Sequence, residues 1–151
     1  MAKLSLMLKK LGSNVKKTFG IGCQVTLPDL LPALSQDQVF QLYKIAQESV
    51  SNAIKHGKAT RVQIKLGVHS RQLQLEVKND GVLFPIDREP SNRMGLRIMN
   101  YRARTIGGTF EIAPGTEAGA VMTCRVPLAN SSTTYSQEAS TRSNGRLALT
   151  A

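Results

Sequence analysis

Two stretches of the chain decide the fold, Leu42–His56 (LYKIAQESVSNAIKH) and Met94–Glu111 (MGLRIMNYRARTIGGTFE). In the first stretch, apolar residues recur at helical spacing, which predicts an amphipathic helix with one buried stripe. The polar side of this helix carries Glu48, Asn52, Lys55 and His56. The second stretch follows a loop-like segment and predicts a helix that starts at Met94 and ends before Gly107–Gly108.

The four polar residues of the first stretch are chemically suited to a nucleotide. Glu48 and Asn52 are four residues apart, so both point to the same side of an ideal helix. The amide oxygen of Asn52 suits Mg²⁺, a hard cation that prefers oxygen ligands and accompanies phosphates. Lys55 and His56 would balance phosphate charge, and Glu48 is suited to act as a general base. The simpler interpretation is a charged helix face that meets only water, and this helix alone does not decide between the two.

The segments around this helix predict a sheet. Ser35 and Gln38 form a capping-box pair that predicts the helix start, and Gly57 predicts its end. Arg61–Val68 alternates between apolar and polar residues, and the pattern returns at Leu73–Val77, which predicts a hairpin with one buried face. Further strands are predicted at Gly22–Leu27, Thr109–Ile112 and Ala120–Leu128, and a further helix at Leu4–Val15. The pattern predicts a two-layer α/β sandwich, with helices on one face of a mixed, largely antiparallel sheet.

Two glycine-containing segments complete the predicted site. Asn79–Asp80–Gly81 directly follows the hairpin, although Asx-Gly pairs are also ordinary turn residues. Met94–Gly95–Leu96 would place backbone N–H groups at the positive end of a helix, where phosphate oxygens bind. A simple helix start explains the same residues. The order of the parts favours a nucleotide pocket, because a polar-faced helix, an Asx-Gly turn, a loop and a glycine-containing helix start follow one another.

The overall composition fits one globular domain of 151 residues with a formal charge of +10, which favours anionic partners in general. Aromatic residues make up 5% of the chain and tryptophan is absent, so stacking platforms are scarce and we expect no nucleic-acid partner. No apolar run approaches the roughly 20 residues that span a bilayer, so we expect no transmembrane segment. Cys23 and Cys124 lack metal-ligand spacing, and a reducing, cytoplasmic setting is expected.

Taken together, the residues from about Leu42 to Leu128 resemble the ATP-binding catalytic domain of bacterial sensor histidine kinases. The resemblance rests on IAQE…NAIKH in the first helix and on GLRIM…YRAR…IGG in the second. That domain belongs to the ATPase superfamily of gyrase B, heat-shock chaperone, histidine kinase and mismatch-repair proteins, which has the Bergerat-type fold. The resemblance implies ATP and Mg²⁺ as ligands. It also implies a histidine-bearing dimerisation domain and a response regulator as partners, and transfer of the γ-phosphoryl group to a histidine as the activity.

The resemblance also assigns roles to individual residues. It implies that Asn52 holds Mg²⁺, that Glu48 assists phosphoryl transfer, and that Lys55 and His56 lie near the phosphates. The nucleotide-binding residues that it implies are Asn52, Lys55, His56, Asn79, Asp80, Gly81, Met94, Gly95 and Leu96.

The chain departs from the family pattern at four positions. Asn79 stands in place of the adenine-binding aspartate; it keeps an acceptor oxygen but loses the charge, which Asp80 would supply. Leu83 and Arg93 stand where the family has glycine, and Ala120 stands where it often has threonine. These departures motivate an alternative function, a non-catalytic nucleotide-binding or protein-interaction module with a degenerate pocket.

The resemblance predicts three segments along the chain. Residues 1–20 would be a linker helix at the end of a truncated or absent dimerisation domain, 21–128 the ATPase domain, and 129–151 a disordered tail. His56 and His69 lie in the pocket helix and in a hairpin turn, so neither fits the role of phosphate acceptor. A domain of the same or another chain would supply that histidine.

Overall fold

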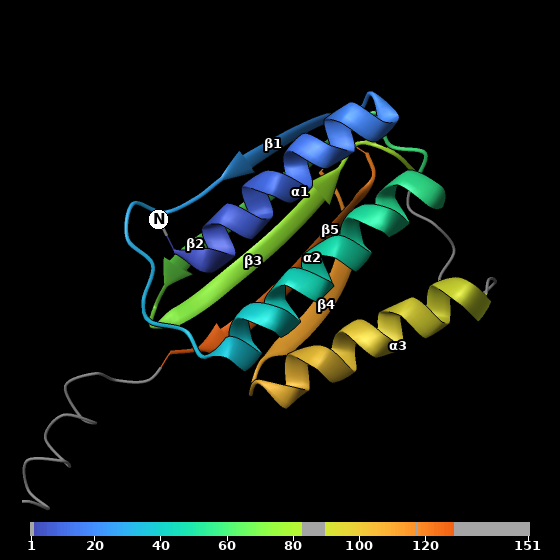
Figure 1. Cartoon of the computed structure of the whole chain (residues 1–151). Coiled ribbons are helices and arrows are strands. Elements are labelled where there is room, and N and C mark those ends of the chain that lie inside the picture. The colour runs from blue at the N-terminus through green and yellow to red at the C-terminus, as the bar shows by residue number, and fades with distance from the viewer. Residues whose placement is uncertain (1, 83–89, 117, 129–151) are drawn as a thin grey trace, which may run out of the picture.

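The computed structural model describes residues 2–82, 90–116 and 118–128, which form three helices and five strands. In chain order the elements are α1 (Lys3–Phe19), β1 (Gly22–Thr26), α2 (Gln36–Lys55), β2 (Arg61–His69), β3 (Gln72–Asn79), α3 (Pro90–Thr105), β4 (Thr109–Pro114) and β5 (Ala120–Pro127). All three helices lie on one face of the sheet, which gives the molecule two layers (Figure 1). This arrangement confirms the predicted two-layer α/β sandwich.

The strands form one sheet in the order β1-β2-β3-β5-β4. β1 runs parallel to β2, and every other neighbouring pair is antiparallel. In the β2–β3 hairpin, Val62 pairs with Asn79 and Leu66 pairs with Leu75, so the buried residues of both strands share one face. The sheet is therefore mixed and largely antiparallel, as the alternation of apolar and polar residues predicts.

α2 forms the centre of the helical layer. A capping box fixes its start: Ser35 Oγ accepts a hydrogen bond from the Gln38 N–H (3.0 Å), and Gln38 Oε1 accepts one from the Ser35 N–H (2.9 Å). The apolar stripe of the helix is buried in the core through Leu42, Ile45, Ala46, Val50 and Ala53. Burial of this stripe fixes the rotation of the helix about its axis, and it thereby fixes the direction in which the polar residues point.

α1 shares its core with the rest of the chain. Its buried apolar residues are Leu4, Leu8, Leu11 and Val15. Gly12 faces β1, where an added Cβ would lie 2.7 Å from Val25 Cγ2, so this glycine permits close packing of the helix on the strand. The helix continues past its predicted end at Val15 to Phe19. The assignment of residues 1–20 to the end of a dimerisation domain stays a prediction.

α3 begins at Pro90, earlier than its predicted start at Met94. The prediction was wrong because it placed Pro90 in a loop, whereas proline is favoured at the first position of a helix. Met94 and Gly95 therefore lie in the second turn, where backbone N–H groups bond within the helix. The predicted phosphate contact required Met94 and Gly95 to have free N–H groups at the start of a helix. In the structure these two residues do not have such groups.

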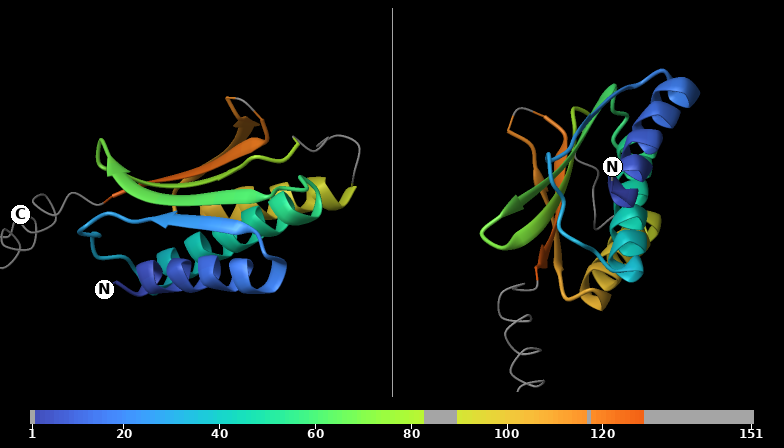
Figure 2. Two further views of the ribbon diagram at one scale, coloured as in Figure 1. Left: turned by 90° about the horizontal axis from the view of Figure 1, so that it is seen from above. Right: turned by 60° about the vertical axis from the view of Figure 1, so that its left-hand side comes forward.

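The start of α1 and the end of β5 lie at the same end of the molecule (Figures 1 and 2). There the Leu128 N–H donates a hydrogen bond to the Arg71 carbonyl in the β2–β3 turn (2.9 Å). The opposite end carries the last turn of α2 and the end of β3 (Figure 1). No helix in the described ranges has the length and apolar character that a membrane crossing requires. The predicted tail, 129–151, lies outside the described residues.

Candidate functional site

The polar face of α2 meets α3 at Glu48 and Asn52. Asn52 is 3% exposed, and within the described part of the chain its Nδ2 atom has no hydrogen-bond partner. Glu48 is half-buried. A Cβ added to Gly95 would lie 2.9 Å from Glu48 Oε2 and 3.7 Å from Asn52 Nδ2. The structure thus brings three of the predicted site residues together, and the missing side chain of Gly95 leaves room for the carboxylate.

A buried contact between α2 and α3, one turn after Gly95 on α3, fixes this arrangement of the two helices. Ser49 Oγ lies 3.4 Å from Met99 Sδ, to which it donates a weak hydrogen bond, and both residues are fully buried. Because Ser49 follows Glu48 directly, this contact fixes the position of the Glu48 backbone relative to α3. The site is therefore built on two packed helices, which hold side chains more firmly than loops do.

The last turn of α2 is fastened to the turn that follows β3. The Gly57 N–H donates a hydrogen bond to the Asn52 carbonyl (3.1 Å), and the Gly57 carbonyl accepts one from the Val82 N–H (2.8 Å). A Cβ added to Gly81 would overlap the same Gly57 carbonyl oxygen, so only glycine permits this approach. The backbone therefore places the Asn79–Gly81 turn directly beside the helix end that carries Asn52.

Asn79 ends β3 with a buried side chain that is 3% exposed. Its Oδ1 accepts a hydrogen bond from the Gly81 N–H (2.9 Å), while its Nδ2 has no partner among the described residues. Gly119, which precedes β5, closes one side of this residue, because an added Cβ would overlap the Asn79 carbonyl oxygen. A buried polar group with an unused donor is costly, so the Asn79 amide is a candidate contact for a ligand.

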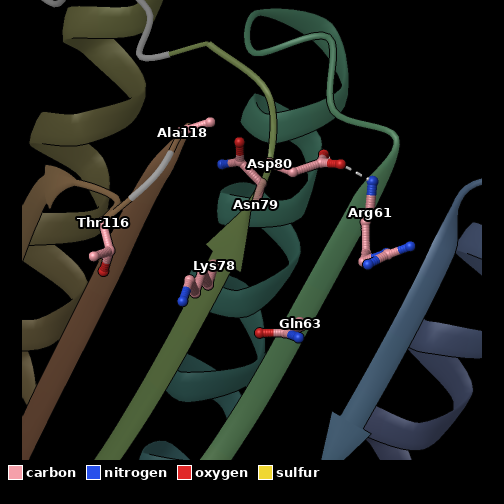
Figure 3. A pocket seen from close by; sticks show the side chains of 7 residues that line it. All are labelled: Arg61, Gln63, Lys78, Asn79, Asp80, Thr116 and Ala118. Carbon is pink, nitrogen blue, oxygen red and sulfur yellow. Dashed lines mark hydrogen bonds between the residues drawn. The ribbon is translucent and has the colours of Figure 1, made fainter.

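Asp80 faces away from Asn79 and towards β2 (Figure 3). Its Oδ1 accepts hydrogen bonds from the N–H groups of Thr60 and Arg61 (both 2.9 Å), and its Oδ2 accepts one from Thr60 Oγ1 (2.7 Å). The Thr60 hydroxyl, followed by these backbone donors, holds the pKa of Asp80 below its ordinary value. Asp80 therefore stabilises the turn, and this geometry does not support the expectation that its charge replaces the one missing at Asn79.

A hollow of about 410 Å³ opens beside Asn79 on the outer face of the sheet (Figure 3). It is lined by Arg61, Gln63, Lys78, Asn79, Asp80, Thr116 and Ala118. Gln63 and Lys78 alternate along their strands with the buried Val62 and Val77, so they point away from the helical layer. The hollow is therefore distinct from the contact between Glu48, Asn52 and Gly95.

The other predicted site residues lie farther from this contact or point elsewhere. Lys55 is exposed and borders an apolar groove between α1 and α2. His56 is half-buried and forms the C-cap of α2. On α3, Met94 is 58% exposed, whereas Leu96 packs against the core. The structure therefore unites Glu48, Asn52 and Gly95, and it leaves Lys55 and Met94 outside that contact.

Three residues that position the site were missed in the sequence. Gly57 and Gly119 act through close approach of the backbone, and Thr60 acts through its hydrogen bonds to Asp80. Gly57 was read only as a helix stop, and no local pattern distinguishes Gly119 from a turn glycine. The proximity of these residues to the site appears only when β2, β3 and β5 are adjacent in the sheet.

The donor set fits Mg²⁺ that arrives with a nucleotide. Among the described residues, no group of three or more His, Cys, Asp or Glu side chains could hold a metal ion without such help. In phosphate sites, Mg²⁺ usually keeps water and phosphate ligands and takes only one or two oxygens from the protein. The neighbouring Glu48 carboxylate and Asn52 amide group, whose oxygens are suitable ligands, would meet that requirement.

Comparison with known proteins identifies the family. Residues 37–130 match the family described as "Histidine kinase-, DNA gyrase B-, and HSP90-like ATPase". The chain belongs to this ATPase family. The sensor histidine kinase LiaS of Bacillus subtilis is 34% identical over 96 residues, which cover 64% of this chain and 27% of LiaS. The sensor protein VraS of Staphylococcus saprophyticus is 36% identical over 87 residues, which cover 58% of this chain and 25% of VraS. The chain thus spans about a quarter of the length of these relatives.

Solved structures of histidine kinases share the fold of this chain. The ATP binding domain of PrrB from Mycobacterium tuberculosis superposes with a TM-score of 0.66 and 21% identity, covering 85% of this chain and 96% of that one. The blue-light activated histidine kinase EL346 of Erythrobacter litoralis gives a TM-score of 0.66 at 23% identity, covering 86% and 43%. At these identities the likeness establishes the fold alone. Together with the family match, it confirms the resemblance to histidine kinase ATP-binding domains.

Proposed function

We propose that this chain is the ATP-binding catalytic domain of a two-component sensor histidine kinase. It binds ATP with Mg²⁺ at the end of the molecule where α2, the Asn79–Gly81 turn and α3 meet. The observation that carries this proposal is the pair of buried amides, Asn52 and Asn79, whose Nδ2 atoms both lack partners in the described structure. The two lie on either side of the backbone link at Gly57.

The residues of α2 act at the phosphate end of the nucleotide. The side chain of Asn52 would provide an oxygen ligand for Mg²⁺, which would supply neutralising charge for the phosphates. Glu48 acts as the general base that takes a proton from the attacking histidine of a partner domain. Lys55 and His56 contribute positive or hydrogen-bonding groups near the phosphates, which requires the exposed Lys55 side chain to swing towards them.

A pair of substitutions on α2 tests these roles. Asn52→Ala should reduce Mg²⁺-dependent ATP affinity by at least about tenfold, because it removes the amide oxygen proposed to hold the metal. Glu48→Gln keeps the size of the side chain, so it should retain ATP binding and lower phosphoryl transfer to an isolated dimerisation domain by about 10²-fold or more. Calorimetry with and without Mg²⁺ and a phosphorylation assay measure the two effects. Unchanged ATP affinity in the Asn52→Ala protein would refute the proposal.

The departures from the family pattern favour a second candidate function. Leu83 and Arg93 replace glycines, and Asn79 replaces the aspartate that the family uses for adenine. A non-catalytic module that retains the fold, with a degenerate pocket, accounts for these changes. Absence of binding at millimolar Mg-ATP by the intact chain would support this second function over the first.

The partners follow from the proposed activity. A histidine-bearing dimerisation domain, on the same or another chain, accepts the phosphoryl group, and a response regulator receives it. We also propose a cytoplasmic location, where ATP is available and where the reducing conditions suit the two free thiols, Cys23 and Cys124.

A further inference from the structure

The outward face of α1 is strongly basic. This helix carries five lysines and no acidic residue, and all five lysines are exposed. Lys3, Lys10 and Lys17 follow one another at intervals of seven residues, close to two helical turns, so they form one row with a spacing of about 10 Å. Lys9 and Lys16 form a second row beside the first. Within the described ranges, none of these ammonium groups forms a hydrogen bond or a salt bridge.

The neighbours of α1 do not balance this charge. β1, which packs against α1, contains no charged residue. Lys55 is the charged residue with which α2 borders the groove between the two helices. One acidic residue, Asp29, lines a hollow beside the helix together with Lys9, but the two form no salt bridge in the described structure. The positive charge of α1 is therefore largely uncompensated, and it attracts anionic partners.

Exposed apolar side chains lie among these lysines. Leu6 is exposed on the same side of α1 as the first lysine row, and Phe19 is exposed at the end of the helix. Leu30 is 87% exposed, and it belongs to the segment 27–35, which lines two hollows together with the first turns of α1. Lysines with apolar side chains between them are typical of surfaces that rest on a membrane, where the charges meet lipid phosphates and the apolar groups enter the acyl boundary.

We infer that α1 is a docking surface for an anionic membrane, with its lysines at the lipid phosphates and with Leu6 and Leu30 at the acyl boundary. The contact is shallow and mainly electrostatic, because the main apolar stripe of α1 is buried in the protein core. Nucleic-acid phosphates would also attract the lysines, but leucine side chains cannot stack on bases as aromatic residues do. A lipid surface is the anionic partner that uses both kinds of exposed side chain.

Docking through α1 is compatible with the proposed function and does not depend on it. α2 lies between α1 and α3 in the helical layer, so α1 and α3 form its two edges (Figure 1). The contact between Glu48, Asn52 and Gly95 lies where α2 meets α3. A membrane against the outward face of α1 therefore leaves that contact open.

Sedimentation with lipid vesicles tests the inference on the intact chain. Vesicles of phosphatidylcholine mixed with phosphatidylglycerol should bind the wild-type protein, whereas vesicles of phosphatidylcholine alone should not. The double variant Lys10→Gln/Lys17→Gln should bind at least about tenfold more weakly, because each lysine near an anionic surface adds to the attraction. Lys58→Gln/Lys65→Gln is the matched control, because it removes the same charge from exposed positions outside α1. Its binding should stay within about threefold of the wild type.

A single tryptophan can report which face meets the lipid, because the natural sequence has none. In Leu30→Trp, fluorescence should shift to the blue with the phosphatidylglycerol vesicles, since the indole enters a less polar boundary. Tyr101→Trp places the same probe at an exposed position on α3, the other basic helix, and it should not shift. Polyglutamate and a single-stranded oligonucleotide should bind the wild type more weakly than the vesicles do, at equal concentrations of negative charge.

Four outcomes would overturn the inference and leave nucleotide binding untouched. The first is failure of the wild-type protein to bind the phosphatidylglycerol vesicles. The second is equal weakening by the two double variants, which would show dependence on net charge alone. The third is a shift in Tyr101→Trp without one in Leu30→Trp, which would place the contact on α3. The fourth is tighter binding of polyglutamate or the oligonucleotide than of vesicles, which would make the partner a protein or a nucleic acid. Thermal melting checks that each variant is folded.

Discussion

Among the single residues, Gly81 has the tightest requirement for space near the site. Gly81→Ala places a Cβ on the Gly57 carbonyl oxygen, so the turn must move away from α2 and the hydrogen bond from the Val82 N–H must lengthen. We expect a loss of about 1–3 kcal/mol in the free energy of unfolding, together with weaker nucleotide binding. Gly22→Ala is the matched control, because nothing lies within 4 Å of its added Cβ, and its effect should stay within about 0.5 kcal/mol. Urea unfolding measures both, and equal effects would show that the close approach is unimportant.

Asp80 should make the stability of the chain depend on pH. Its pKa is lowered in the folded state, so its ionised form stabilises the fold at neutral pH, and this contribution is lost as the pH falls through the folded pKa. Asp80→Asn should therefore be less stable than the wild type at pH 7. The difference should begin to shrink below about pH 4, where the carboxyl of the unfolded chain takes up a proton, and it should vanish once the pH falls below the lowered pKa of the folded state. Unfolding curves at pH 7 and pH 3 test this, and a difference that does not change with pH would contradict it.

At the scale of elements, the capping box gives α2 its start. Ser35→Ala removes the acceptor for the Gln38 N–H, and it should lower the free energy of unfolding by about 1 kcal/mol. Ser51→Ala, within the same helix, removes a hydroxyl from a position where alanine is the better helix former, so it should have little effect or a stabilising one. Denaturant titration of both variants compares a cap with an interior position. A Ser35→Ala protein as stable as the Ser51→Ala protein would exclude a role for the cap.

The sequence predicted helices and strands correctly where neighbouring residues determine them, through helix caps or the alternation of apolar and polar residues. The Ser35–Gln38 pair fixed the start of α2, and the alternation in Arg61–Val68 fixed which face of β2 is buried. The prediction failed at Pro90, because a proline can end a helix or begin one, and the residues beside it do not say which. Gly12 provides room for Val25 of a strand that lies later in the chain, a contact that the residues of α1 alone do not indicate.

At the scale of the whole molecule, the two cysteines report on the integrity of the core. Burial raises the pKa of the Cys124 thiol to about 12, and it also raises the pKa of Cys23. In a Cys23→Ser variant, Cys124 should react with Ellman's reagent at pH 8 roughly a thousandfold more slowly than in the unfolded chain, because thiolate is scarce and access is blocked. Rapid modification of the native variant would show that β5 is not buried as described.

The site could be predicted only in part, because it depends on contacts between distant segments. Glu48 and Asn52 were found from their spacing on one helix, which is a local property. The approach of Gly119 to Asn79 needs β5 beside β3, and the orientation of Asp80 needs Thr60 beside the end of the hairpin. The residues next to the Asn79–Gly81 turn in the sequence do not indicate that Gly119 and Thr60 lie beside it.

The first turn of α1 and the end of β5 lie at the opposite end of the molecule from the last turn of α2 and the end of β3, which carry Asn52 and Asn79 (Figure 1). A fluorescent protein or surface tether fused before Lys3 or beyond Leu128 would therefore stand clear of the proposed ligand entrance. The same geometry means that a pull transmitted through those attachment points acts on α1 and β5 first, and it reaches the helix that carries Glu48 only through the packed interior.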